Sequence, residues 1–177
     1  MLNRRDAALS FGALWTALVL PAGARAQTTP PLGWTPKAVT ADQARTLDAV
    51  AEIMIPATST PGARAAGVPQ FVDRALATWC TPADAAALKA GLDQIDTDAR
   101  ASGGAAFAAL PAAQQAALVS RYDADGKAFW RQLKELVTTG YFTSEPGATI
   151  ALRYDPVPGD YRGCVPLKDI GRGWATS

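Results

Sequence analysis

Two groups of acidic side chains have the residue types and spacing that catalysis or metal binding would need. Asp93, Asp96 and Asp98 lie close together, and Asp123 and Asp125 follow some 25 residues later. Paired carboxylates act as general acid and base when they face one another across a cleft, about 5–10 Å apart. Clusters this local in sequence are more often solvated helix faces or helix caps. A calcium loop would need further ligands and a closing Glu at spacings that this sequence lacks.

The chain has no histidine. This absence excludes the Ser-His-Asp and Cys-His nucleophile arrangements and the common zinc and iron sites that contain histidine. No glycine-rich phosphate or dinucleotide motif follows a predicted strand. The sequence therefore predicts that this chain holds no cofactor and no metal and is not itself an enzyme. Acid–base catalysis by Tyr, Lys and Asp side chains stays open as an alternative.

Cys80 and Cys164 are the only two cysteines. In an oxidising compartment a disulfide between them would persist, and it would close a loop of about 84 residues, worth about 4 kcal/mol. A reactive thiol is the alternative, whereas attachment of c-type haem needs a Cys-x-x-Cys-His motif that is absent. We predict a structural disulfide between Cys80 and Cys164.

The first 26 residues have the three parts of a signal peptide. Arg4 and Arg5 form a basic start, a weakly apolar stretch follows, and Ala24 and Ala26 provide the small residues of a cleavage site after Ala26. The arginine pair favours the twin-arginine route, which carries folded proteins. A retained membrane anchor would need about 20 apolar residues, and Pro21 ends this stretch too early. We therefore predict export to the periplasm through the twin-arginine translocase.

Removing this segment leaves a chain of nearly balanced charge. It takes away three of the 17 basic and one of the 16 acidic side chains, which leaves 14 and 15. A nucleic-acid-binding protein needs a concentrated basic patch, and none is present, so no nucleic-acid partner is expected. The remaining length suits one domain.

Apolar periodicity predicts an all-α fold, a small bundle of about five helices. A capping box formed by Thr40 and Gln43 begins the first helix, which stops before Pro56. Further helices are predicted over about 69–79, from Thr81 to about 102, after Pro111, and over about 125–139, where Gly140 would close the last one. Trp79 and Phe129, at helical spacing, are assigned to the core.

Outside these helices the chain is irregular. Residues 27–39 are predicted to form an extended leader to the helical domain of residues 40–140, and residues 141–177 a long Pro-, Gly- and aromatic-rich C-terminal arm. Because disordered segments lack aromatics, we expect the arm to be ordered and to wrap the domain and a partner protein. Aromatic and Arg side chains are typical of protein interfaces. The predicted partner-binding residues are Tyr141, Phe142, Glu145, Tyr154, Tyr161, Arg162 and Trp174.

Three stretches of the arm carry a resemblance to a known family. They are Gly-Tyr-Phe-Thr-Ser-Glu-Pro-Gly at 140–147, Tyr-Asp-Pro-Val-Pro-Gly-Asp-Tyr-Arg-Gly-Cys-Val-Pro at 154–166 and Gly-Arg-Gly-Trp-Ala at 171–175. With Leu-Asp-Ala-Val-Ala-Glu-Ile-Met-Ile-Pro-Ala-Thr at 47–58, they resemble the gluconate 2-dehydrogenase subunit 3 family. This family is similar to the small gamma subunit of bacterial FAD-dependent glucose and sorbitol dehydrogenases.

The resemblance implies a complex of three subunits. A large flavoprotein of the glucose-methanol-choline type would carry FAD and oxidise the substrate, and a multihaem cytochrome c would pass electrons to the inner membrane. The small subunit would bind the flavoprotein, aid its maturation and take it through the twin-arginine translocase. A stand-alone periplasmic helical binding protein is the alternative.

Overall fold

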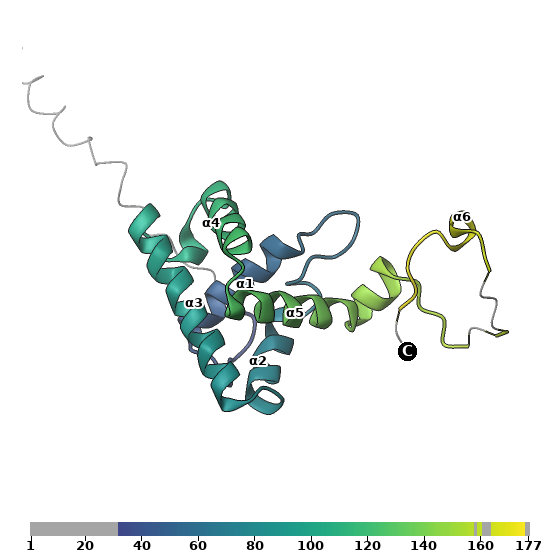
Figure 1. Ribbon diagram of the computed structural model, residues 1–177, viewed down its shortest axis with the longest axis horizontal. Coiled ribbons are helices and arrows are strands. Elements are labelled where there is room, and N and C mark those ends of the chain that lie inside the picture. Colours follow the sequence, from purple (N-terminus) through teal and green to yellow (C-terminus); the bar gives the residue numbers. More distant parts are fainter. Residues whose placement is uncertain (1–31, 158, 161–163, 176–177) are drawn as a thin grey trace, which may run out of the picture.

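Helices form the regular structure of this chain in the computed structural model (Figure 1), which describes residues 32–157, 159–160 and 164–175. The all-α prediction is confirmed. The elements in order are α1 (Ala41–Met54), α2 (Val68–Thr78), α3 (Pro82–Gly103), a 3-10 turn η1 (Phe107–Ala109), α4 (Ala112–Asp125), α5 (Ala128–Phe142), a π-helical turn η2 (Gly147–Ala151) and α6 (Leu167–Ile170).

Local capping signals position the starts of α1 and α3, as the sequence predicted. The Thr40 hydroxyl accepts from the Gln43 backbone N–H at 3.2 Å, and the Gln43 side chain accepts from the Thr40 N–H at 3.0 Å. Thr81 caps α3 by accepting from the Asp84 N–H at 3.2 Å. Each cap satisfies backbone donors that the first helical turn leaves unpaired.

The predicted bounds of the fifth helix are wrong at both ends. Gly126 adopts a left-handed conformation, with φ 59°, and ends α4, so α5 begins only at Ala128. At the other end α5 continues through Gly140 to Phe142. The reason is a close approach, since a Cβ on Gly140 would lie 2.6 Å from Cδ1 of Phe71 on α2. Gly140 therefore serves helix packing and does not end the helix.

The core lies where α5 packs against α1, α2 and α3. Trp130 and Tyr122 are its largest fully buried side chains, and their rings stack with centroids 5.5 Å apart. Phe129 packs against this core from its edge. The assignment of Trp79 to the core is wrong, because this side chain is 65% exposed. Trp79 is the C-cap residue of α2, one position beyond the last residue of that helix.

The end of the predicted leader belongs to the folded body. The carboxylate of Asp73 on α2 is 3% exposed and accepts three backbone N–H groups. The donors are Lys37 at 2.8 Å, Ala38 at 2.8 Å and Val39 at 3.1 Å. This buried carboxylate therefore fixes the segment before α1 onto α2.

We expect Asp73→Asn to lower the free energy of unfolding by about 1–3 kcal/mol, because one amide oxygen cannot accept all three N–H groups and the amide NH₂ faces further donors. Urea unfolding of the chain without its first 26 residues measures this loss. Asp42→Asn is the matched control, because the Asp42 side chain is 84% exposed in an ion pair with Arg45. Equal stability of the two variants would contradict the structural role of Asp73.

Candidate partner-binding surface

The arm projects away from the helices at the end of α5, and α6 lies at its upper edge in the view of Figure 1. Its first turn, η2, packs on α5. Gly147 makes that contact possible, because a Cβ there would lie 1.8 Å from the carbonyl oxygen of Tyr141. In its described residues, therefore, the arm extends outward and does not wrap the helical domain as the sequence led us to expect.

The exposed apolar side chains of the described chain concentrate on the arm. Among the described residues seven large hydrophobic side chains are exposed, and six of them lie at or beyond the last residue of α5. These six are Phe142, Ile150, Tyr154, Val157, Val165 and Trp174, and their exposed fractions run from 39% to 80%. Large exposed apolar patches mark protein–protein contact sites, and these six side chains are the candidates for such a patch.

The two ends of the outer arm are joined at a base, which we call the arm base, formed by Arg153, Gly173, Trp174 and Ala175. The Arg153 N–H donates to the Gly173 carbonyl at 2.8 Å, and the Ala175 N–H donates to the Arg153 carbonyl at 2.9 Å. The Arg153 guanidinium carbon lies 4.2 Å from the centre of the Trp174 ring. This distance is well within the range of a cation–π interaction.

The predicted partner-binding residues divide into buried and exposed side chains. Tyr141 is only 2% exposed, and its hydroxyl donates to the Pro61 carbonyl at 2.7 Å. Tyr141 therefore belongs to the core, and its assignment to the partner-binding surface is wrong. The reason is that Tyr141 still belongs to α5, of which it is the next-to-last residue. Phe142, Glu145, Tyr154 and Trp174 are exposed. Tyr161 and Arg162, like the export residues Arg4, Arg5, Ala24 and Ala26, lie outside the described residues.

Sequence reasoning missed four residues of this surface: Arg153, Ile150, Val157 and Val165. The apolar three carry no periodic signal, since Val157 and Val165 stand in irregular backbone and Ile150 stands in the short π-helical turn η2. The sequence signal for Arg153 was only that of a basic residue close to aromatic residues in the chain. Its partner Trp174 lies 21 residues away, and the fold of the arm brings the two together.

The predicted disulfide is not formed in the structure, where Cys80 and Cys164 are free thiols. Cys80 follows α2, whereas α6, which begins three residues after Cys164, lies in the arm that projects away from the helices (Figure 1). Burial, together with the nearby Asp84 carboxylate, raises the pKa of the Cys80 thiol. The reactive thiolate considered as the alternative is therefore disfavoured at Cys80.

The family model described as gluconate 2-dehydrogenase subunit 3 matches residues 41–159. That range covers more than half of the 177 residues and includes α1 to α5 and the first part of the arm. The chain belongs to the gluconate 2-dehydrogenase subunit 3 family. No curated protein and no solved structure matches it significantly. The family is that of a small subunit of a dehydrogenase complex.

The clustered carboxylates of this subunit 3 family member join helices to their neighbours. Gln43 on α1 donates to Asp93 at 2.9 Å. Asp96 accepts from the Phe107 N–H of η1 at 2.8 Å, and Asp98 accepts from the Tyr122 hydroxyl of α4 at 2.8 Å. In the described part of the chain, no three His, Cys, Asp or Glu side chains gather as a metal site would require. These carboxylates therefore hold α3 against α1, η1 and α4.

Ionisation of Asp98 and Tyr122 matches this structural role. Burial opposes the charged form of Asp98, but hydrogen bonds from Tyr122 and Gln94 and the charge of Arg121 hold its pKa below the ordinary value of 3.8. Burial and the Asp98 carboxylate together raise the pKa of the Tyr122 hydroxyl. At neutral pH Asp98 is therefore a fixed acceptor and Tyr122 a fixed donor, and neither is poised for proton transfer.

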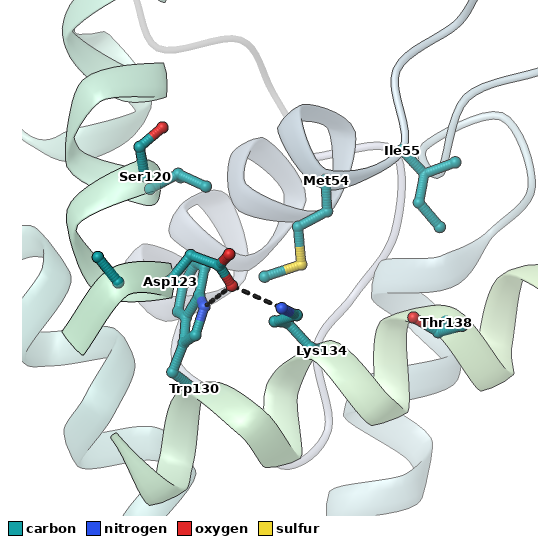
Figure 2. Close-up of a pocket in the computed structure, with 9 residues that line it drawn as sticks. Met54, Ile55, Ser120, Asp123, Trp130, Lys134 and Thr138 are labelled. Carbon is teal, nitrogen blue, oxygen red and sulfur yellow. Dashed lines mark hydrogen bonds and ion pairs between the residues drawn. The ribbon is translucent and has the colours of Figure 1, made fainter. Parts of the chain in front are cut away.

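A groove of about 450 Å³ lies between the end of α1, α4 and α5 (Figure 2). Met54 and Ile55 form part of its apolar wall. At its floor Asp123 accepts from the indole N–H of Trp130 at 3.1 Å and pairs with Lys134. The hydrogen bond from Lys134, and to a smaller extent the one from Trp130, lower the pKa of Asp123. Because Asp123 and Lys134 neutralise each other, the groove presents no unpaired charge for a charged substrate.

No helix in the described part of this family member is long and apolar enough to cross a bilayer.

Proposed function

We propose that this chain is the non-catalytic small subunit of a periplasmic FAD-dependent dehydrogenase of sugars, polyols or gluconate. The observation that carries the proposal is the concentration of exposed apolar side chains on the projecting arm, where six of the seven large hydrophobic residues exposed in the described part of the chain lie. The body buries its own apolar stripes, and Asp93, Asp96 and Asp98 pair with neighbouring helices. Membership of the subunit 3 family supports a dehydrogenase complex as the setting.

In this proposal the cofactors belong to the partner subunits. The flavoprotein, of the glucose-methanol-choline type, carries FAD and oxidises the substrate, and a multihaem cytochrome c carries the electrons to the inner membrane. The absence of histidine from the small subunit supports this division, because it removes the commonest ligand and general base from the chain. The small subunit binds the flavoprotein and supplies the export signal.

The same proposal assigns the small subunit an escort role. The paired Arg4 and Arg5 at the start of the sequence are the signal expected of a twin-arginine substrate. Because that route accepts folded proteins, a flavoprotein without a signal of its own could cross as a passenger bound to the arm. The complex would then act in the periplasm beside the inner membrane.

Tyr154→Ala tests the arm as the partner-binding surface. The Tyr154 side chain is 49% exposed and is not part of the hydrophobic core, so removing its ring should leave the folded body intact. If its ring is buried at the centre of the interface, its truncation should weaken flavoprotein binding about thirtyfold, since such aromatics cost about 2 kcal/mol or more. Calorimetry with a purified, FAD-loaded flavoprotein of the glucose-methanol-choline type measures the affinity.

Trp79→Ala is the control for this measurement, because Trp79 is an exposed aromatic of the helical body and not of the arm. The proposal expects its affinity to equal that of the wild type. A wild-type chain that binds no flavoprotein would instead favour a stand-alone binding protein. A loss with Trp79→Ala and none with Tyr154→Ala would place the interface on the body.

A further inference from the structure

The arm base joins the two ends of the outer arm. Two backbone hydrogen bonds and the stacking of Arg153 on Trp174 join its ends. Next to this base, the side chain of Arg172 donates to the carbonyl of Ile150 in η2. The two ends of the outer arm, at Arg153 and at residues 173–175, are therefore held at one place.

The chemistry of the outer arm is apolar and electrically balanced. From residue 143 onward the sequence has four basic and four acidic side chains, which are Arg153, Arg162, Lys168 and Arg172 against Glu145, Asp155, Asp160 and Asp169. Steering by net charge therefore contributes little. The exposed Tyr154, Val157 and Val165 offer apolar surface instead. A partner that fits the outer arm presents an apolar recess and no strongly charged patch.

Resting on the proposed function above, we propose that Arg153 holds the arm as a preformed loop that inserts its apolar side chains into an apolar recess of the flavoprotein. Arg153 is a positioning residue, since its side chain covers the Trp174 ring within the arm. A loop already held in its bound shape loses less conformational entropy on binding. The arm base thus sets the affinity through the shape of the loop.

The test compares Arg153→Ala, Arg153→Lys and Arg131→Ala in calorimetry with the FAD-loaded flavoprotein. We expect Arg153→Ala to bind about tenfold more weakly, because it removes the cation–π contact, and Arg153→Lys to lie between it and the wild type. Arg131→Ala is the control, because Arg131 is an exposed arginine of α5. Raising NaCl from about 0.05 M to about 0.5 M should change the wild-type affinity by less than about threefold.

Two further measurements separate positioning from general instability. Hydrogen exchange at the amides of residues 153 and 175, which donate across the arm base, should accelerate in Arg153→Ala. The melting temperature should stay at the wild-type value, because the buried core ends at Tyr141. A purely structural role in the body would lower the melting temperature and leave those two amides unchanged.

The outcomes keep this inference distinct from the proposed function. If the wild type binds the flavoprotein and Arg153→Ala binds equally well, the positioning role is overturned and the proposed function stands. Strong weakening of wild-type binding by salt would contradict the proposal that the partner site is an apolar recess. If the wild type does not bind the flavoprotein at all, both proposals fail.

Discussion

Replacing Arg4 and Arg5 together with Lys should leave this chain, and the flavoprotein bound to it, in the cytoplasm. The exchange keeps both positive charges but removes both guanidinium groups, whose planar array of donors a lysine ammonium cannot reproduce. A receptor that reads the arginine pair should therefore reject the variant, whereas general secretion needs only a basic start. We expect near-complete loss of periplasmic protein, measured by fractionation and immunoblotting.

Arg25→Lys is the matched control, since it exchanges the same residue type inside the same predicted signal but outside the pair. Its export should equal that of the wild type. The flavoprotein is followed in the same fractions through its FAD-dependent dye reduction. Normal periplasmic amounts of the double Lys variant would contradict the twin-arginine prediction, and they would not bear on the proposed partner-binding surface of the arm.

The escort role predicts that export and binding separate in a different variant. Tyr154→Ala retains Arg4 and Arg5, so the small subunit itself should still reach the periplasm. A weakened arm would leave the flavoprotein behind, provided that the passenger crosses only while bound. The Lys pair variant should leave both proteins in the cytoplasm, whereas Tyr154→Ala should leave only the flavoprotein there. This difference distinguishes an escort from two independently exported subunits.

The parts of the fold that the sequence predicted are those that local interactions decide. The capping box of Thr40 and Gln43 and the Thr81 cap need only residues three positions apart, so the starts of α1 and α3 could be read directly. The end of α5 could not, because Gly140 continues the helix under the ring of Phe71, which lies 69 residues earlier. Glycine propensity alone favours a helix end at that position.

The candidate surface shows the same limit. Composition predicted an irregular aromatic arm, and the structure places exposed aromatic and aliphatic side chains there. Its direction depends on contacts that composition does not encode, chiefly the packing of Gly147 on the Tyr141 carbonyl. The pairing of Cys80 with Cys164 was predicted from cysteine count and compartment, and neither gives the distance between α2 and the arm.

Helical spacing also chose the wrong tryptophan for the core. It favoured Trp79, which is 65% exposed, while Trp130, next to the chosen Phe129, is 1% exposed. Either residue of the pair Phe129 and Trp130 fits the apolar stripe of α5. Stacking on Tyr122 and the hydrogen bond to Asp123 on α4 place Trp130 inside, and Phe129 packs at the edge beside Gly91.

Trp130→Ala should therefore lower the free energy of unfolding by about 3–5 kcal/mol, because it leaves a large cavity under α4 and removes the stack on Tyr122. The melting temperature should fall by about 10–20 °C. Trp79→Ala, the same substitution at an exposed site, should change the free energy of unfolding by less than about 1 kcal/mol. Urea and thermal unfolding of both variants measure the difference.

A Trp130→Phe variant makes this prediction specific to packing, and it provides a folded protein if the alanine variant does not fold. Phenylalanine keeps an aromatic ring against Tyr122 but removes the indole N–H that donates to Asp123. Because the Asp123 side chain is 53% exposed and keeps Lys134 as its partner, losing that hydrogen bond should cost only about 1 kcal/mol. Most of the remaining loss comes from the smaller ring, so Trp130→Phe should lie between the wild type and Trp130→Ala. Equal losses for Trp130→Ala and Trp79→Ala would show that α5 does not bury Trp130, and the arrangement of α4 against α5 would then be wrong.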